Sequence, residues 1–200
     1  MKKPNHSGSG QNPALLAGSG EAVNSRFLIA RCRAPTTTDR VRETLFNWLA
    51  PVIVDAQCLD CFAGSGALGL EALSRYAAGA TSIEMDRAVS QQLIKNLATL
   101  KTGNARVVNS NAMSFLAQKG TPHNIVFVDR PFRRGLLEET INLLEDNGWL
   151  ADEALIYVES EVENGLPTVP ANWSLHREKV AGQVAYRLYQ REAQGESDAD

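Results

Sequence analysis

From residue 57 onward, short apolar segments alternate with longer segments whose apolar residues recur at helical spacing. Such alternation predicts a parallel sheet with helices on both faces. We expect strands at 57–62, 81–86, 105–110, 124–128 and 154–159. We expect helices from Thr38 or Asp39 to 49, over about 67–78, over 89–100, over 113–117, and from 136 to the stop signal Asn147-Gly148.

The C-terminal part of the sequence changes pattern. Residues 173–180 and 184–190 alternate between polar and apolar side chains and flank Ala181-Gly182-Gln183, which is typical of a β-hairpin. The expected fold is therefore α/β and doubly wound, with a mostly parallel seven-stranded sheet closed by an antiparallel hairpin. We expect a flexible segment at 1–35, one folded domain at 36–193 and an acidic tail at 194–200.

Composition narrows the possible surroundings of the chain. Of its 200 residues, 44% are hydrophobic and 22% are charged, as in globular domains, and the net charge is −3. A nucleic-acid contact must then come from a local basic patch rather than from the overall charge. We find no apolar run long enough for a membrane span or a signal peptide, and the cysteine count is odd, so we predict a cytoplasmic protein without a membrane partner.

A glycine motif follows the first expected strand. The segment 59–69 reads Leu-Asp-Cys-Phe-Ala-Gly-Ser-Gly-Ala-Leu-Gly and contains G-x-G-x-x-G. Glycines at a strand-to-helix junction let a ligand lie against the backbone and the N–H groups of the helix start. Glycines also occur at such turns for packing alone, and that alternative stays open.

Acidic residues indicate which ligand the turn would hold. Glu84 lies twenty residues after Gly64, at the end of the next strand, where a carboxylate accepts the hydroxyls of a ribose; Asp86 is the rival. Asp60 stands four residues before Gly64, a place where an acid receives the ammonium group of a methionine moiety. Nicotinamide cofactors lack that group, so the pattern favours S-adenosylmethionine, with a nicotinamide-dependent oxidoreductase as the alternative.

The third motif is Asp129-Arg130-Pro131-Phe132, directly after the fourth strand. Together with Asp60, the Gly64-Ser65-Gly66 turn and the segment 38–43 (Thr-Asp-Arg-Val-Arg-Glu), it resembles the bacterial 16S ribosomal RNA guanine-N2 methyltransferases of the small-subunit methyltransferase D type. The resemblance covers roughly residues 37–193.

The resemblance implies a function and a set of site residues. The reaction would be methylation of the exocyclic N2 amine of guanine 966 in 16S ribosomal RNA. The cofactor would contact Asp60, Phe62, Ala63, Gly64, Ser65, Gly66, Glu84, Met85, Asn111 and Ala112. The catalytic segment would be Asp129, Arg130, Pro131 and Phe132.

The chemistry of the amine explains those residue types. Its lone pair is delocalised into the base, so the amine is a poor nucleophile. Asp129 and the main-chain carbonyl of residue 130 would accept its two N–H groups, localise the lone pair and aim it at the methyl group. Phe132 would stack on the extruded base.

Two stretches depart from the family pattern. Arg130 replaces the first proline of the signature, which favours, as a further alternative, a catalytically impaired protein that still binds cofactor or RNA. The family's basic, glycine-containing β segment is not recognisable in residues 11–35. The Arg-Pro-Thr that usually precedes the first helix is represented by Ala34-Pro35-Thr36-Thr37-Thr38, which is out of register.

Basic residues near these motifs suggest where RNA would bind. We expect Arg40, Arg42, Arg133 and Arg134 to contact phosphates. The partner would be 16S ribosomal RNA or the assembling small subunit, not DNA, and the protein is expected to be a monomer. We expect no metal, because Cys58 and Cys61 lie three residues apart in a strand and point to opposite faces.

Overall fold

The computed structural model describes residues 39–129 and 134–193. The strands are β1 (Gln57–Asp60), β2 (Gly79–Glu84), β3 (Ala105–Asn109), β4 (His123–Val128), β5 (Leu150–Glu161), β6 (Trp173–Ala181) and β7 (Val184–Arg191). The helices are α2 (Asp39–Leu49), α3 (Ala67–Ser74), α4 (Arg87–Thr99), α5 (Ala112–Leu116), α6 (Arg134–Asp146) and a 3-10 turn at Val162–Asn164. Residues 1–35 and 194–200, expected to be a flexible segment and an acidic tail, lie outside the described residues.

All seven strands form one sheet in the order β3-β2-β1-β4-β5-β7-β6. The first five strands run parallel, and β7 pairs antiparallel with both β5 and β6. Each parallel connection crosses through a helix, while the short loop at 182–183 joins β6 to β7 directly. The predicted mostly parallel sheet with a closing hairpin is therefore confirmed.

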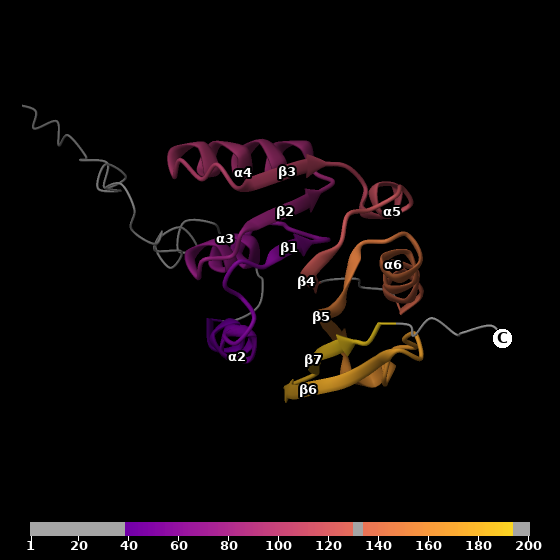
Figure 1. Cartoon of the computed structure of the whole chain (residues 1–200). Coiled ribbons are helices and arrows are strands. Elements are labelled where there is room, and N and C mark those ends of the chain that lie inside the picture. The colour runs from indigo at the N-terminus through magenta and orange to yellow at the C-terminus, as the bar shows by residue number, and fades with distance from the viewer. Residues whose placement is uncertain (1–38, 130–133, 194–200) are drawn as a thin grey trace, which may run out of the picture.

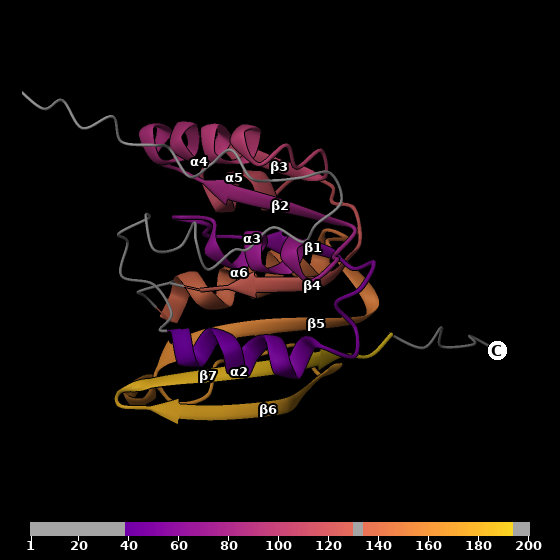
Figure 2. The same ribbon diagram turned by 90° about the vertical axis from the view of Figure 1, so that its left-hand side faces the viewer.

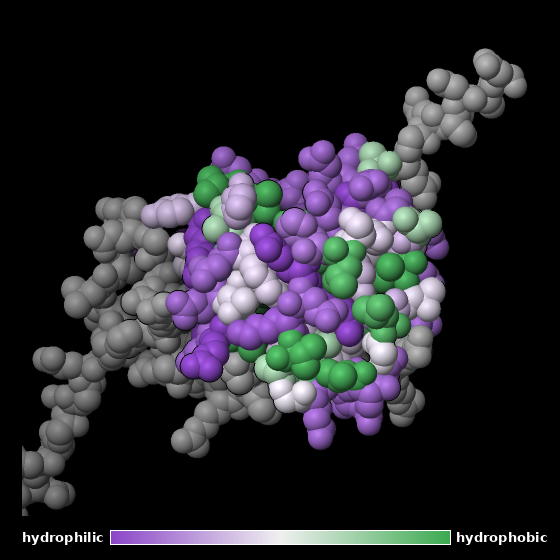
Figure 3. All heavy atoms as spheres, turned by 90° about the horizontal axis from the view of Figure 1, so that it is seen from below, coloured by the Kyte–Doolittle hydropathy of each residue, from purple (hydrophilic) through white to green (hydrophobic). Residues whose placement is uncertain are grey.

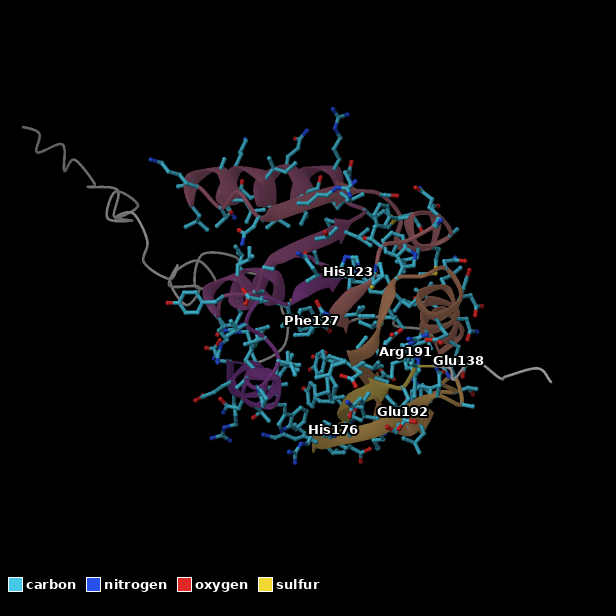
Figure 4. All side chains as sticks on the ribbon, in the orientation of Figure 1. His123, Phe127, Glu138, His176, Arg191 and Glu192 are labelled. Atoms are coloured by element: carbon cyan, nitrogen blue, oxygen red, sulfur yellow. The ribbon has the colours of Figure 1, made fainter. Side chains whose placement is uncertain are left out.

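Two apolar cores lie on opposite faces of the sheet (Figure 1). One packs α2 and α3 against the sheet and includes Phe127, which Figure 4 shows directed from β4 toward these helices. The other packs α5 and α6 against the opposite face and includes Ile156. Cys58 belongs to the first core and Cys61 to the second, as their spacing predicts, and both thiols are buried.

Several boundaries differ from those expected, because turn and cap residues end the elements earlier. The second strand spans 79–84 rather than 81–86, since the carboxylate of Asp86 caps α4 by accepting from the Val89 N–H. Helix α3 ends at Ser74 rather than near Ala78, and Tyr76 adopts a φ of 70° in the turn that follows. The first strand ends at Asp60, so that the glycine turn can begin.

The buried stripe of α2 also differs from the expected one. Helical spacing of the apolar residues predicts a buried stripe of Val41, Leu45, Trp48 and Leu49. The buried residues are instead Val41, Arg42, Leu45, Phe46 and Leu49, with Trp48 half-buried. The stripe is rotated toward Arg42 and Phe46 because Phe46 packs on Phe127 of β4, with ring centroids 6.0 Å apart. As a result, a cation at position 42 faces the protein instead of solvent.

Within the described ranges, no helix is long and apolar enough to cross a membrane. The same ranges contain no cluster of three or more histidine, cysteine, aspartate or glutamate side chains arranged to hold a metal ion.

Candidate active site

The motif residues meet at one edge of the sheet. Parallel strands end at a common edge, and in an open α/β sheet ligands bind outside those carboxyl ends, where neighbouring crossovers go to opposite faces. Here that point lies between β1 and β4, whose following helices cover different faces. Helix α2 begins at the same edge, as Figure 2 shows.

The glycine turn needs its two glycines for different reasons. Gly64 has a φ of 53° and Gly66 a φ of 76°, both in the left-handed region that side chains disfavour. A Cβ on Gly66 would also collide with the side chain of Leu93 from α4. The turn is anchored to the neighbouring strands: the Ala63 N–H donates to the Ile83 carbonyl and the Cys61 N–H to the Phe127 carbonyl.

Glu84, at the end of β2, is bonded to this turn. Its Oε2 accepts from the Gly64 N–H at 2.8 Å, and its Oε1 accepts from the Asp86 N–H at 2.9 Å. The carboxylate thus stands beside the glycine turn, in the position expected of a ribose-binding acid. The carboxylate of Asp86 caps α4 by accepting from the Val89 N–H. This favours Glu84 over Asp86 as the acid that would bind a ribose.

The residues expected beside the adenine also lie together. The Asn111 side chain caps α5 by accepting from the Met113 N–H at 2.8 Å, and its Nδ2 donates to the Met85 sulfur at 3.7 Å. Met85 is 69% exposed, while Ala112 is buried. An exposed thioether beside a helix start offers an apolar surface next to polar groups, which suits a base lying at the end of β2.

A small hollow lies between the ends of β1 and β4, the glycine turn, α2 and the start of α3. It is lined by Arg42, Asp60, Phe62, Ala63, Ser65, Ala67, Leu68 and Asp129. Two acids and one arginine therefore border the same hollow, at the edge of the sheet where the glycine turn and Glu84 also lie.

Asp60 is a deeply buried acid on the β1 side of the pocket. It is 2% exposed, and its carboxylate accepts from the Phe62 N–H at 3.3 Å. Burial and then the nearby charge of Asp129 raise the pKa of Asp60 to about 8; the charge of Glu84 acts in the same direction and the Phe62 hydrogen bond against it. A cationic ligand beside this carboxylate would reverse that effect.

Asp129 directly follows β4 and is 4% exposed. On the next strand, the Tyr157 hydroxyl donates to Glu159 at 2.6 Å. Burial, then the charge of Glu159 with a contribution from Asp129, raises the pKa of Tyr157 well above its ordinary value and likewise that of Tyr186. The tyrosines of β5 and β7 therefore lie within the electrostatic influence of Asp129, although they do not line the hollow.

The other predicted catalytic and RNA-binding residues are only partly described. Arg130, Pro131, Phe132 and Arg133 lie outside the described residues, and Arg134 is described only as the first residue of α6. Arg40 is exposed on the first turn of α2, whereas the side chain of Arg42 is 8% exposed and pairs with Asp39. These two arginines face different surroundings although they lie on the same turn.

The sequence patterns missed the place of Arg42 in the pocket wall. Charge alone groups Arg42 with Arg40 and the other arginines expected at phosphates. Its position directly after Val41 and four residues before Phe46 is the signal that was overlooked, because both neighbours are buried.

The antiparallel β7 between β5 and β6, with the pocket at the carboxyl ends of β1 and β4, defines a Rossmann-like methyltransferase of class I, the S-adenosylmethionine-dependent class.

A family model described as "Conserved hypothetical protein 95" matches residues 20–190. The ribosomal RNA small subunit methyltransferase D of Escherichia coli K12 is 87% identical over all of both chains, and that of Haemophilus influenzae is 53% identical over 77% of this chain and 81% of its own.

Among solved structures, a putative methyltransferase from Escherichia coli superposes with a TM-score of 0.79 at 94% identity, covering 82% of this chain and 91% of that one. The chain therefore belongs to the family of ribosomal RNA small subunit methyltransferase D.

Proposed function

We propose that this protein transfers a methyl group from S-adenosylmethionine to the N2 amine of a guanine in 16S ribosomal RNA, by resemblance guanine 966. The observation that carries the proposal is the placement of Asp129. Its buried carboxylate follows β4 and shares one pocket with Asp60, the acid expected at the methionine end of the cofactor. An acid that accepts the target amine would thus stand beside the donor.

The chemistry of the donor groups fits this cofactor. In this proposal Asp60 receives the methionine ammonium, and the free lone pairs of Glu84 accept the ribose hydroxyls. Met85 and the start of α5 border the adenine. Bound there, the cofactor supplies an electrophilic methyl group on a sulfonium.

The chain's own residues would hold and activate the amine. Asp129, with the carbonyl of residue 130, accepts its N–H groups, and Phe132 stacks on the base. Transfer replaces one N–H by N–CH3, so one proton must leave the nitrogen, and we assign Asp129 to receive it. The rest of the rate enhancement would come from holding the amine in line with the methyl group.

The RNA would approach over the pocket rim. Arg40 is exposed there, and Arg133 and Arg134 follow the catalytic segment in sequence. The substrate is either free 16S ribosomal RNA or the assembling small subunit, and we propose a cytoplasmic monomer that acts on neither DNA nor a membrane. The nicotinamide alternative loses support, because dinucleotide-binding sheets of the 3-2-1-4-5-6 order lack the inserted antiparallel β7.

A methylation assay tests the proposal. Small subunits and naked 16S ribosomal RNA from cells that lack the modification are incubated with radiolabelled S-adenosylmethionine, and the product nucleoside is identified. We expect label on N2 of one guanine, and no label when inosine, which lacks the amine, replaces it. Asp129→Ala should slow single-turnover transfer by about a hundredfold or more, whereas the exposed control Glu153→Ala should leave it unchanged. Label on another atom would contradict the proposal.

A further inference from the structure

The side chain of Arg42 is a nearly buried cation that is only partly compensated by neighbouring groups. Only 8% of it is exposed, and a buried cation is costly unless an anion compensates it. Within the residues that the structure describes, its guanidinium makes one hydrogen bond, to Asp39, which is itself 90% exposed. A guanidinium has five N–H donors, so most of its bonding capacity remains for the pocket that it lines.

Arg42 does not compensate the acids of that pocket. No ion pair joins it to Asp60 or Asp129 in the described part of the chain. Nor does it appear among the groups that set the pKa of Asp60, which are burial, two carboxylates and one backbone N–H. The pocket thus has an acid on the β1 wall and a separate cation on the α2 wall.

We infer that Arg42 binds the carboxylate of the cofactor's methionine moiety, while Asp60 binds the ammonium on the same carbon. An α-amino acid carries both charges within a few ångströms, so it matches an acid and a cation on facing walls. A guanidinium and a carboxylate form paired, charge-assisted hydrogen bonds. The inference rests on the proposed cofactor and assigns Arg42 to it instead of to RNA.

The contrast with Arg40 supports this assignment. The two residues lie on the same turn of α2, but Arg40 is exposed and Arg42 is buried. A phosphate of an RNA backbone can approach Arg40 without entering the pocket. A small carboxylate can enter the pocket and replace Asp39 as the partner of Arg42, since exposed Asp39 can turn to solvent at little cost.

A double-mutant cycle between protein and ligand tests the inference. Calorimetry measures the affinities of S-adenosylmethionine and of its decarboxylated analogue for the wild type, Arg42→Met and the matched control Arg40→Met. The wild type and Arg40→Met should prefer the carboxylated ligand by about tenfold to a hundredfold. In Arg42→Met the preference should fall below about threefold, while the affinity for the analogue changes little.

Two further variants keep the test decisive if Arg42→Met folds poorly. Arg42→Lys keeps the charge but loses the paired geometry, so the preference should shrink without vanishing. Asp39→Asn removes the competing carboxylate and should raise the affinity for S-adenosylmethionine a few-fold without raising that for the analogue. Full preference in the Arg42 variants would overturn the inference. Failure of the wild type to bind either ligand would instead overturn the proposed function.

Discussion

Because burial raises the pKa of the Asp60 carboxyl group to about 8, cofactor binding should be coupled to the release of a proton from Asp60. Asp60 in the folded chain stays protonated at neutral pH, whereas an ammonium ligand requires its carboxylate form. Binding at pH 7 should therefore release a proton, and the binding heat should depend on the ionisation enthalpy of the buffer. The pocket keeps the acid neutral until a cation arrives, which limits the cost of burying its charge.

The same group should make stability depend on pH. The pKa of Asp60 is raised from about 4 in the unfolded chain to about 8, so the folded state holds the extra proton between these values and stability falls as the pH rises through them. Asp60→Asn cannot titrate. Its melting temperature relative to the wild type should therefore rise from pH 4 to pH 8 and level off above. A pH-independent difference would contradict the shift.

Arg130 is a second residue with a testable consequence. A proline at this position fixes φ in the family signature, and arginine does not. A small misplacement of the amine costs roughly a hundredfold in rate. Arg130→Pro should therefore raise single-turnover methylation substantially and shift the melting temperature by only a few degrees. Equal rates at saturating cofactor and RNA would show that the signature works without its proline.

At the scale of elements, one glutamate joins α6 to the hairpin. Glu145 accepts from Arg191 at 2.8 Å, from the Trp173 indole at 2.9 Å and from the Asn172 amide at 2.9 Å. Figure 4 shows Arg191 directed toward α6. Burial alone would raise the pKa of Glu145, but these hydrogen bonds and the charge of Arg191 outweigh it and lower the pKa.

Glu145→Gln should destabilise the protein by about 1–3 kcal/mol, because Arg191, whose side chain is 13% exposed, then keeps only the more distant and exposed carboxylate of Asp152 as a charge partner. A lowered pKa means that the stabilisation is present above the unfolded value, near 4.3, and is lost as the pH falls through the folded value. Urea unfolding at pH 7 and at pH 3 measures both effects, and the gap between variant and wild type should narrow at the lower pH. Glu153→Gln, exposed on β5, is the control.

The existence of helices and strands is predictable where a repeating pattern of apolar residues marks them. Their ends are less predictable, because a single cap or turn residue decides where an element stops. Apolar runs such as that of β4 predicted the parallel strands, and the hairpin followed from alternation around Gly182. The start of α4 was misplaced because Asp86 reads equally well as the end of a strand or as a helix cap. Motif spacing predicts that Glu84 lies beside the glycine turn, as it does. The position of Arg42 in the pocket wall could not be predicted in this way, because it depends on how α2 packs on β4 through Phe46 and Phe127.

At the scale of the whole molecule, the reactivity of two buried thiols measures whether both apolar cores exclude solvent. Cys58 and Cys61 lie in opposite cores, and burial raises the pKa of the Cys58 thiol to about 12. Alkylation requires a thiolate, so labelling in the native protein should be about a thousandfold slower than in the urea-unfolded chain. Cys32 lies outside the described residues, and Cys32→Ser removes its signal. Mass spectrometry of the labelled protein measures the rates, and native labelling at the rate of a free thiol would contradict the closed cores.

The last strand of the sheet has a consequence for self-association. An outermost strand offers unpaired backbone groups to which a second copy can add, and flat apolar edges aggregate. Strand β6 is outermost, and its Leu175 and Val180 are 44% and 52% exposed. Between them, however, the pairing is interrupted by a bulge between Leu175 and Arg177, and the charged residues Arg177, Glu178 and Lys179 follow. Figure 3 shows the apolar groups of this lower face separated by hydrophilic ones. We therefore expect the hairpin that completes the fold also to hinder the addition of a second copy along this edge of the sheet.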